Sequence, residues 1–127
     1  MQKRFTLLLS ALMLCGGISA QEQGTKSKMK SIINEQFEFA AKQYRVLAKN
    51  TPASRMPKTY NAKKDQSVSS DTKWWCSGFY PGTLLYIYEV TGDQEILAEA
   101  LVRLDTLEKE KHYTGNHDLG FMMYCSF

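Results

Sequence analysis

Apolar residues recur at spacings of three and four along most of this chain, and this period restricts the fold more than any other feature of the sequence. The clearest stripe consists of Ile96, Leu97, Ala100, Leu101, Leu104 and Leu107. Such a spacing places the side chains on one face of an α-helix. A second stripe, between Met29 and about Lys49, consists of Ile32, Ile33, Phe37, Ala40, Ala41, Tyr44, Leu47 and Ala48. We therefore expect an all-α fold.

Turn residues mark the ends of these helices. Asn50 and Pro52 end the first one, because proline has no amide hydrogen to donate and disfavours helical geometry in the residue before it. Gly92 suits the left-handed position that closes a helix, and Asp93 suits the N-cap of the next helix. That helix is expected to end near Lys111, with an ion pair between Glu99 and Arg103 on a different face from the apolar stripe.

Three segments are less regular. Residues 51–73 are polar and rich in serine, and they are expected to form a long loop, which in a compact domain is usually functional or mobile. Residues 83–90 are apolar or aromatic almost without a break, which fits a buried helix or a buried strand, and periodicity does not decide between them. Residues 119–127 are mostly apolar up to the last residue, which predicts a final helix still running where the sequence ends.

The first twenty residues have the pattern of a secretory signal peptide. Lys3 and Arg4 precede an apolar run over residues 5–14, and small residues lead to a cleavage position after Ala20. A run of about ten apolar residues is too short for a membrane anchor, which needs roughly 20. We therefore predict export of a mature chain that is periplasmic or secreted and has no membrane contact after cleavage.

Net charge argues against a nucleic-acid partner. The 127 residues contain 16 Lys plus Arg and 13 Asp plus Glu, a formal charge of +3. Removal of residues 1–20 also removes Lys3 and Arg4, so residues 21–127 carry 14 basic and 13 acidic side chains. A charge of +1 provides no electrostatic attraction for a phosphate backbone. Cys76 and Cys125 remain, and they could pair or stay reduced.

Two segments contain the residues that could support chemistry. In residues 74–82, aromatic side chains surround two glycines and a proline, so they either stack against a sugar ring or plug the entrance of a helix. In residues 117–122, Asp118 precedes an apolar helix, where it is either a proton-transfer group or simply an N-cap. His112 and His117 have no recognisable metal-ligand spacing with a cysteine, and we expect neither a metal nor a cofactor.

The order of three motifs resembles the N-terminal part of glycoside hydrolase family 88, the unsaturated glucuronyl hydrolases. These motifs are Trp75-Cys76-Ser77-Gly78-Phe79-Tyr80-Pro81-Gly82-Thr83-Leu84, then Tyr88-Glu89 with Thr91-Gly92-Asp93, then His117-Asp118-Leu119-Gly120-Phe121-Met122. Cys76 stands where the family commonly has threonine. The resemblance covers nearly all of residues 21–127 and implies the N-terminal portion of an (α/α)6 toroid, incomplete in this chain, in which residues 83–90 are helical.

The resemblance also implies a substrate and a reaction. The substrate is an oligosaccharide left by a polysaccharide lyase, ending in a 4,5-unsaturated uronic acid. A carboxylic acid protonates C4 of the vinyl ether, and water adds at C5. Asp118 matches one of two family aspartates, Trp75 matches a tryptophan that lines the pocket, and His117 is a pocket residue. The second aspartate, which donates the proton, would lie beyond residue 127, so this chain alone is expected to be inactive.

Two alternatives remain open. One is the related family that acts on unsaturated rhamnogalacturonan fragments, although residues 117–121 favour the glucuronyl enzymes. The other is a helical module that binds a sugar or a protein partner without catalysis and uses the same aromatic residues as a platform.

Overall fold

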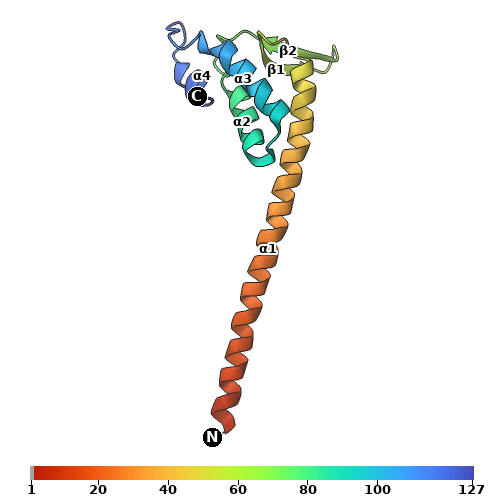
Figure 1. Ribbon diagram of the computed structural model, residues 1–127, viewed down its shortest axis with the longest axis vertical. Helices are drawn as coiled ribbons and strands as arrows, with labels where there is room; N and C mark the ends of the chain where they lie inside the picture. The colour runs from red at the N-terminus through yellow and green to blue at the C-terminus, as the bar shows by residue number, and fades with distance from the viewer. Residues whose placement is uncertain (1) are drawn as a thin grey trace. The chain divides into compact units, whose positions relative to one another are not determined.

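The computed structural model describes residues 2–127, with side chains from Gln23 onwards. The chain divides into two compact units, residues 1–36 and residues 37–127. The elements along the chain are α1 (Gln2–Lys49), β1 (Met56–Asn61), β2 (Gln66–Ser70), α2 (Phe79–Thr91), α3 (Gln94–Glu108) and α4 (Leu119–Tyr124) (Figure 1). The backbone of the predicted signal peptide belongs to α1, but its side chains lie outside the described residues.

The first unit contains the N-terminal part of α1. Ile32 and Ile33 belong to the apolar stripe predicted for this helix, and both of them are exposed. None of the described helices has an apolar stretch of the length that spans a bilayer.

The second unit has a small helical core. Its buried members come from α1, the first strand, α2 and α3, and they are Ala41, Met56, Tyr80, Leu84, Ile87, Ile96, Ala100 and Leu107. Figure 1 shows α2 and α3 side by side as a helical hairpin, joined by a short turn. Residues 83–90 are therefore helical, as the family resemblance implied. The predicted α3 stripe is wrong for one residue, Leu101, which is exposed.

Arg103 explains why the stripe on α3 differs from the prediction. Its side chain is 1% exposed and forms the expected pair with Glu99, at 2.6 Å between Nη2 and Oε1. The guanidinium also donates to the main-chain carbonyls of Thr51 at 3.0 Å and Pro52 at 2.6 Å. It lies 5.5 Å from the ring centroid of Tyr80. A charged side chain thus occupies the core and fixes the segment that follows α1.

The predicted long loop over residues 51–73 is wrong, because most of it forms an antiparallel β-hairpin. β1 pairs with β2 from Met56 opposite Ser70 to Asn61 opposite Gln66, with an irregularity between Pro57 and Thr59. Asp65 adopts the positive φ of 48° that the turn requires. The polar composition concealed this hairpin because Met56 is the main anchor, and it is fully buried.

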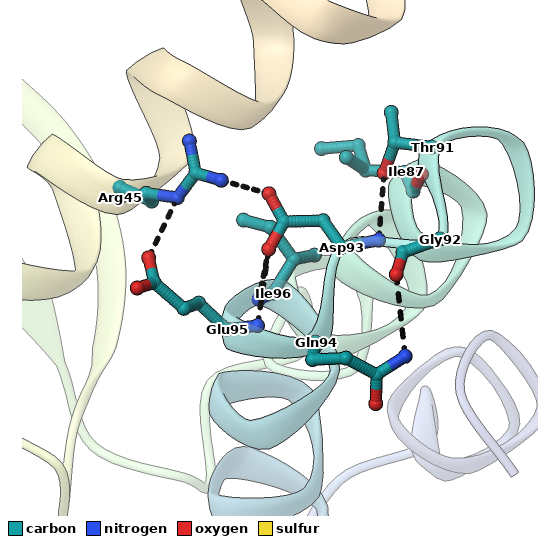
Figure 2. A network of polar contacts seen from close by, with 8 residues as sticks. All are labelled: Arg45, Ile87, Thr91, Gly92, Asp93, Gln94, Glu95 and Ile96. Atoms are coloured by element: carbon teal, nitrogen blue, oxygen red, sulfur yellow. Dashed lines mark hydrogen bonds and ion pairs between the residues drawn. The ribbon is translucent and has the colours of Figure 1, made fainter.

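The turn between α2 and α3 has the conformation that the sequence predicts. Gly92 has a φ of 70° and Asp93 accepts hydrogen bonds from the amides of Glu95 at 3.0 Å and Ile96 at 3.3 Å. The guanidinium of Arg45, on α1, binds the carboxylate of Asp93 and lies 2.9 Å from Glu95 (Figure 2). The capping residue therefore also connects the helical hairpin to α1.

The last helix is shorter than predicted. α4 ends at Tyr124, and the carbonyl of Met123 accepts from the amides of both Ser126 and Phe127. These two bonds to one carbonyl tighten the chain into a turn. α3 likewise ends at Glu108, before the predicted boundary near Lys111.

Candidate functional site

Two glycines bring the two candidate motifs together at the start of α2. A Cβ atom on Gly78 would lie only 2.7 Å from the carbonyl oxygen of Phe121 and would overlap that of Met122. A Cβ atom on Gly82 would overlap the carbonyl of Cys125. The backbones of α2 and α4 approach one another this closely only because both positions lack a side chain. The segments 74–82 and 117–122, far apart in sequence, are thus neighbours.

The contact between these motifs produces a cluster of three aromatic rings, formed by Trp75, Phe79 and Phe121. Each pair of ring centroids is 6.2 Å apart, and Trp75 meets the other two rings edge to face. The three side chains are 46%, 41% and 52% exposed. Rings that only plugged a helix entrance would be largely buried, so this half-exposed cluster is better suited to stacking against a ligand.

Asp118 occupies the N-cap position of α4 but does not use its side chain as a cap. Its main-chain carbonyl accepts from the amides of Phe121 at 2.9 Å and Met122 at 3.2 Å, whereas its carboxylate makes no capping hydrogen bond. Instead the carboxylate lies 3.3 Å from Nε2 of His117, and its side chain is 24% exposed. The simple N-cap interpretation of Asp118 is therefore wrong for the side chain.

A cleft of about 400 Å³ lies beside this carboxylate. Its lining residues are His117, Asp118, Gly120, Phe121, Tyr124 and Cys125. The side chain of His117 is 92% exposed and so is free to contact a ligand. Trp75 does not line this cleft, but its ring contacts Phe121, which does.

Cys76 belongs to the same neighbourhood. Partial burial, and secondarily the negative charge of Asp118, raise the pKa of the Cys76 thiol above its usual value. Both Cys76 and Cys125 are free thiols, so the pairing that the sequence left open does not occur here. The shift places the carboxylate of Asp118 within electrostatic reach of the first motif.

Sequence reasoning assigned no role in the site to Asn116 or Ser77. Asn116 holds the loop before Asp118, because its side-chain oxygen accepts from the amide of Asp118 at 2.9 Å and its amide donates to the carbonyl of Lys73 at 3.3 Å. Ser77 is fully buried, and its hydroxyl has no hydrogen-bond partner among the described residues. The glycines spaced by four residues in segment 74–82 were the signal that a second backbone packs there.

No group of three or more His, Cys, Asp or Glu side chains in the described part of the chain could hold a metal ion. The arrangement instead provides one carboxylate, an adjacent imidazole and a half-exposed aromatic surface. Such a combination suits a sugar, whose hydroxyl groups bind carboxylates and whose C–H faces stack on aromatic rings.

Comparison with known proteins finds two similar enzymes. No family model matches the chain. The chain is 31% identical over 108 residues to an unsaturated glucuronyl hydrolase of Formosa agariphila, which covers 84% of this chain and 27% of that protein. It also resembles the crystal structure of an unsaturated glucuronyl hydrolase specific for heparin, with a TM-score of 0.66 and 32% identity, over 73% of this chain and 25% of that one.

These matches, together with the helical core, show that the chain folds as part of an all-α, (α/α)6 toroid. The predicted resemblance to the unsaturated glucuronyl hydrolases is confirmed, and the chain is related to about one quarter of such an enzyme. The roles of Asp118, Trp75 and His117 stay predictions, because neither match identifies functional residues.

Proposed function

We propose that this chain is part of an unsaturated glucuronyl hydrolase that removes 4,5-unsaturated uronic acid from oligosaccharides left by polysaccharide lyases. The observation that carries the proposal is the carboxylate of Asp118, which makes no capping bond and lies at a cleft beside a half-exposed aromatic cluster. The related proteins, named as unsaturated glucuronyl hydrolases, support this choice of substrate.

The reaction proposed from the family resemblance is hydration of a vinyl ether rather than direct displacement at the anomeric carbon. A carboxylic acid gives its proton to C4, and the positive charge that develops at C5 is shared with the ring oxygen. A water molecule, deprotonated by the same carboxylate, adds to C5 and forms a hemiketal. Opening of this hemiketal leads to release of the next sugar, and the acid regains its proton from the water.

Asp118 has a supporting role in this proposal. Its carboxylate accepts hydrogen bonds from sugar hydroxyls and keeps a second carboxyl group protonated, since two neighbouring carboxylates do not both ionise readily. His117 contacts the uronic acid from the open side of the cleft. Trp75 packs against Phe121 and so supports the ring that meets the sugar. Among the described residues, no second carboxyl group forms a hydrogen bond with Asp118. We therefore propose that the 127-residue polypeptide alone does not catalyse hydrolysis.

The test uses the ultraviolet absorbance of the conjugated double bond in an unsaturated disaccharide. We expect the isolated chain to leave this absorbance unchanged. A chimera in which residues 21–127 replace the matching quarter of the heparin-specific relative should hydrolyse the disaccharide. Within the chimera, Asp118→Asn should lower kcat/KM at least about 100-fold, a typical cost of losing an electrostatic catalytic group.

The matched control is Asp105→Asn, because Asp105 is an exposed carboxylate on α3, outside the cleft. We expect the control to keep the activity of the parent chimera. A folded chimera without activity, or one in which both substitutions have the same effect, would contradict the proposed function.

The exposed aromatic cluster favours a second candidate, a non-catalytic module that binds sugars or a protein partner. Such a module would bind saturated and unsaturated disaccharides equally well in a calorimetric titration. It would also leave the chimera inactive, which separates it from the hydrolase.

We also propose that the protein is exported to the periplasm or the medium with removal of residues 1–20. The support is the sequence pattern of two basic residues, an apolar run and small residues before the cleavage position. Mass spectrometry of the protein from expressing cells should find an N-terminus at Gln21. An intact N-terminus on protein recovered only from the cytoplasm would contradict export.

A further inference from the structure

A second cavity lies next to the candidate site, on the side of the β-hairpin. This hairpin groove has a volume of about 400 Å³ and is formed by the end of α1, both strands and the start of α2. Aromatic side chains provide much of its lining, and they are Tyr44, Tyr60, Trp74, Phe79 and Tyr80. The groove is therefore a surface on which a sugar ring can stack.

The hairpin groove also has a positive charge at its edge. The ammonium group of Lys58 lies 5.4 Å from the ring centroid of Trp74, and both residues line the groove. In the described part of the chain, no carboxylate forms an ion pair with Lys58. Its charge is therefore available to a ligand.

Beyond Lys58 and Trp74 lies a basic hollow of about 430 Å³, which both residues also line. Arg55 and Lys73 contribute to it, together with one acid, Asp71. The guanidinium of Arg55 donates to the hydroxyl of Ser69 at 2.8 Å and to its carbonyl at 3.0 Å, which keeps the positive charge in place. An anionic group bound to Lys58 would thus have a second cation nearby.

The charge of the hairpin differs from that of the rest of the domain. Residues 51–73 contain five basic and two acidic side chains, a balance of +3. The other residues of the 21–127 segment contain nine basic and eleven acidic side chains, a balance of −2. The near-neutral total conceals this separation, which directs an anionic ligand to the hairpin.

The hairpin groove is connected to the Asp118 cleft through two residues. Phe79 lines the groove, while its ring contacts Trp75 and Phe121 of the aromatic cluster. Cys76 also lines the groove and experiences the charge of Asp118. A sugar in the groove would therefore be a neighbour, along an oligosaccharide, of a sugar at Asp118.

We propose that the hairpin groove binds an anionic sugar unit, whose ring stacks on Trp74 and whose sulfate or carboxylate group binds Lys58. The proposal rests on the proposed function, because it treats this unit as the continuation of the oligosaccharide held at Asp118. The hairpin would then favour anionic polymers over neutral ones.

Calorimetric titration of the full chain tests this proposal with three tetrasaccharides. One is a sulfated product of a heparin lyase, one is an unsulfated, uronic-acid-containing product of a hyaluronan lyase, and one is neutral cellotetraose. We expect both anionic probes to bind at least about tenfold more tightly than the neutral one, and more weakly at higher salt. Equal affinity for sulfated and unsulfated probes assigns the carboxylate to Lys58, whereas preference for the sulfated probe assigns the sulfate.

Two substitutions separate the charge from the stacking. Lys58→Gln should weaken binding of the anionic probes about tenfold and leave cellotetraose unchanged, since it removes one charge-assisted hydrogen bond. Trp74→Ala should weaken all three probes by a similar factor. The matched controls are Lys109→Gln and Tyr86→Ala, which remove an exposed cation and an exposed ring outside both cavities. Circular dichroism checks that each variant is folded. If Trp74→Ala unfolds, Lys58→Gln still tests the proposal, because Lys58 is exposed and its replacement should not affect folding.

The proposal is overturned if the wild-type chain binds no anionic probe, or if Lys58→Gln and Trp74→Ala bind as the controls do. An Asp118→Asn arm distinguishes this failure from that of the proposed function. The groove alone would be rejected if Asp118→Asn no longer bound the unsaturated tetrasaccharide more tightly than the saturated one, while Lys58→Gln had no effect on binding. An effect of Lys58→Gln on a chain with no such preference would support the groove and reject the hydrolase.

Discussion

Two aspartates at helix N-caps, Asp93 and Asp118, show how differently two motifs of one chain are used. The carboxylate of Asp93 accepts two amide hydrogen bonds and binds Arg45, so the fold uses its oxygens (Figure 2). The carboxylate of Asp118 caps nothing and lies beside a cleft with exposed His117. A motif whose polar groups are all used by the fold is structural, whereas one with a free carboxylate and half-exposed rings can bind a ligand.

The largest expected effect concerns the structural side of this comparison. Replacing Arg103 with methionine leaves three main-chain carbonyls and Glu99 without their buried partner, which should cost about 3 to 5 kcal/mol of unfolding free energy. Urea unfolding followed by circular dichroism measures this loss. Lys111→Met is the matched control, because the exposed pair of Lys111 with Glu108 should contribute little to stability. Similar unfolding midpoints for both variants would show that Arg103 does not anchor the core.

The next effect tests whether glycine holds the two candidate motifs together. Gly78→Ala should cost about 1 to 3 kcal/mol, because the added methyl group overlaps the carbonyl of Met122 and pushes α4 away from α2. It should also separate Trp75 from Phe121 and change the tryptophan fluorescence. In Gly120→Ala, the new Cβ would lie 3.7 Å from the ring of Tyr124, an ordinary contact, so this control should be neutral or slightly stabilising. Equal stability of the two variants would contradict the close packing of the helices.

A smaller effect is expected at the structural N-cap. Asp93→Ala removes two amide hydrogen bonds and the partner of Arg45, and it should cost about 1 to 2 kcal/mol by urea unfolding. Glu95→Ala is the control, since it removes only the more exposed of the two carboxylates near Arg45. A cost below that of the control would mean that Asp93 is not the residue that joins α1 to the helical hairpin.

The smallest effect concerns Cys76. Because burial and the charge of Asp118 raise the pKa of its thiol above the usual value, alkylation by iodoacetamide should reach half its maximal rate at a higher pH than for a free cysteine. Asp118→Asn removes the negative charge that opposes thiolate formation, so the midpoint should fall. Peptide mass spectrometry at a series of pH values follows this cysteine separately from Cys125. An unchanged midpoint in Asp118→Asn would place the carboxylate away from Cys76.

The sequence predicted the helices well because their signals are local. The stripe on α3, the left-handed Gly92 and the cap at Asp93 each depend on neighbours within a few positions. Two features could not be predicted in this way. The burial of Arg103 depends on contacts with residues about fifty positions away, and the β-hairpin depends on one buried anchor, Met56.

The candidate site was predictable in part. Trp75, His117 and Asp118 were selected through the family resemblance, whereas the residue types alone left a plug role open for Trp75 and a cap role open for Asp118. The structure adds that Gly78 and Gly82 bring the two segments together, which no local pattern contains. The hairpin groove was not predicted, because its lining comes from four separate elements and its charge is hidden in the total composition.

The most direct test of the contrast between the two aspartates is a calorimetric titration of Asp118→Ala with an unsaturated uronic-acid disaccharide, beside its urea unfolding curve. We expect the unfolding free energy to stay within about 0.5 kcal/mol of the wild type. We also expect binding to weaken at least about tenfold, because we propose that the carboxylate contacts the sugar and not the fold. A variant destabilised as much as Asp93→Ala that still binds the disaccharide with wild-type affinity would show that Asp118 is a structural cap.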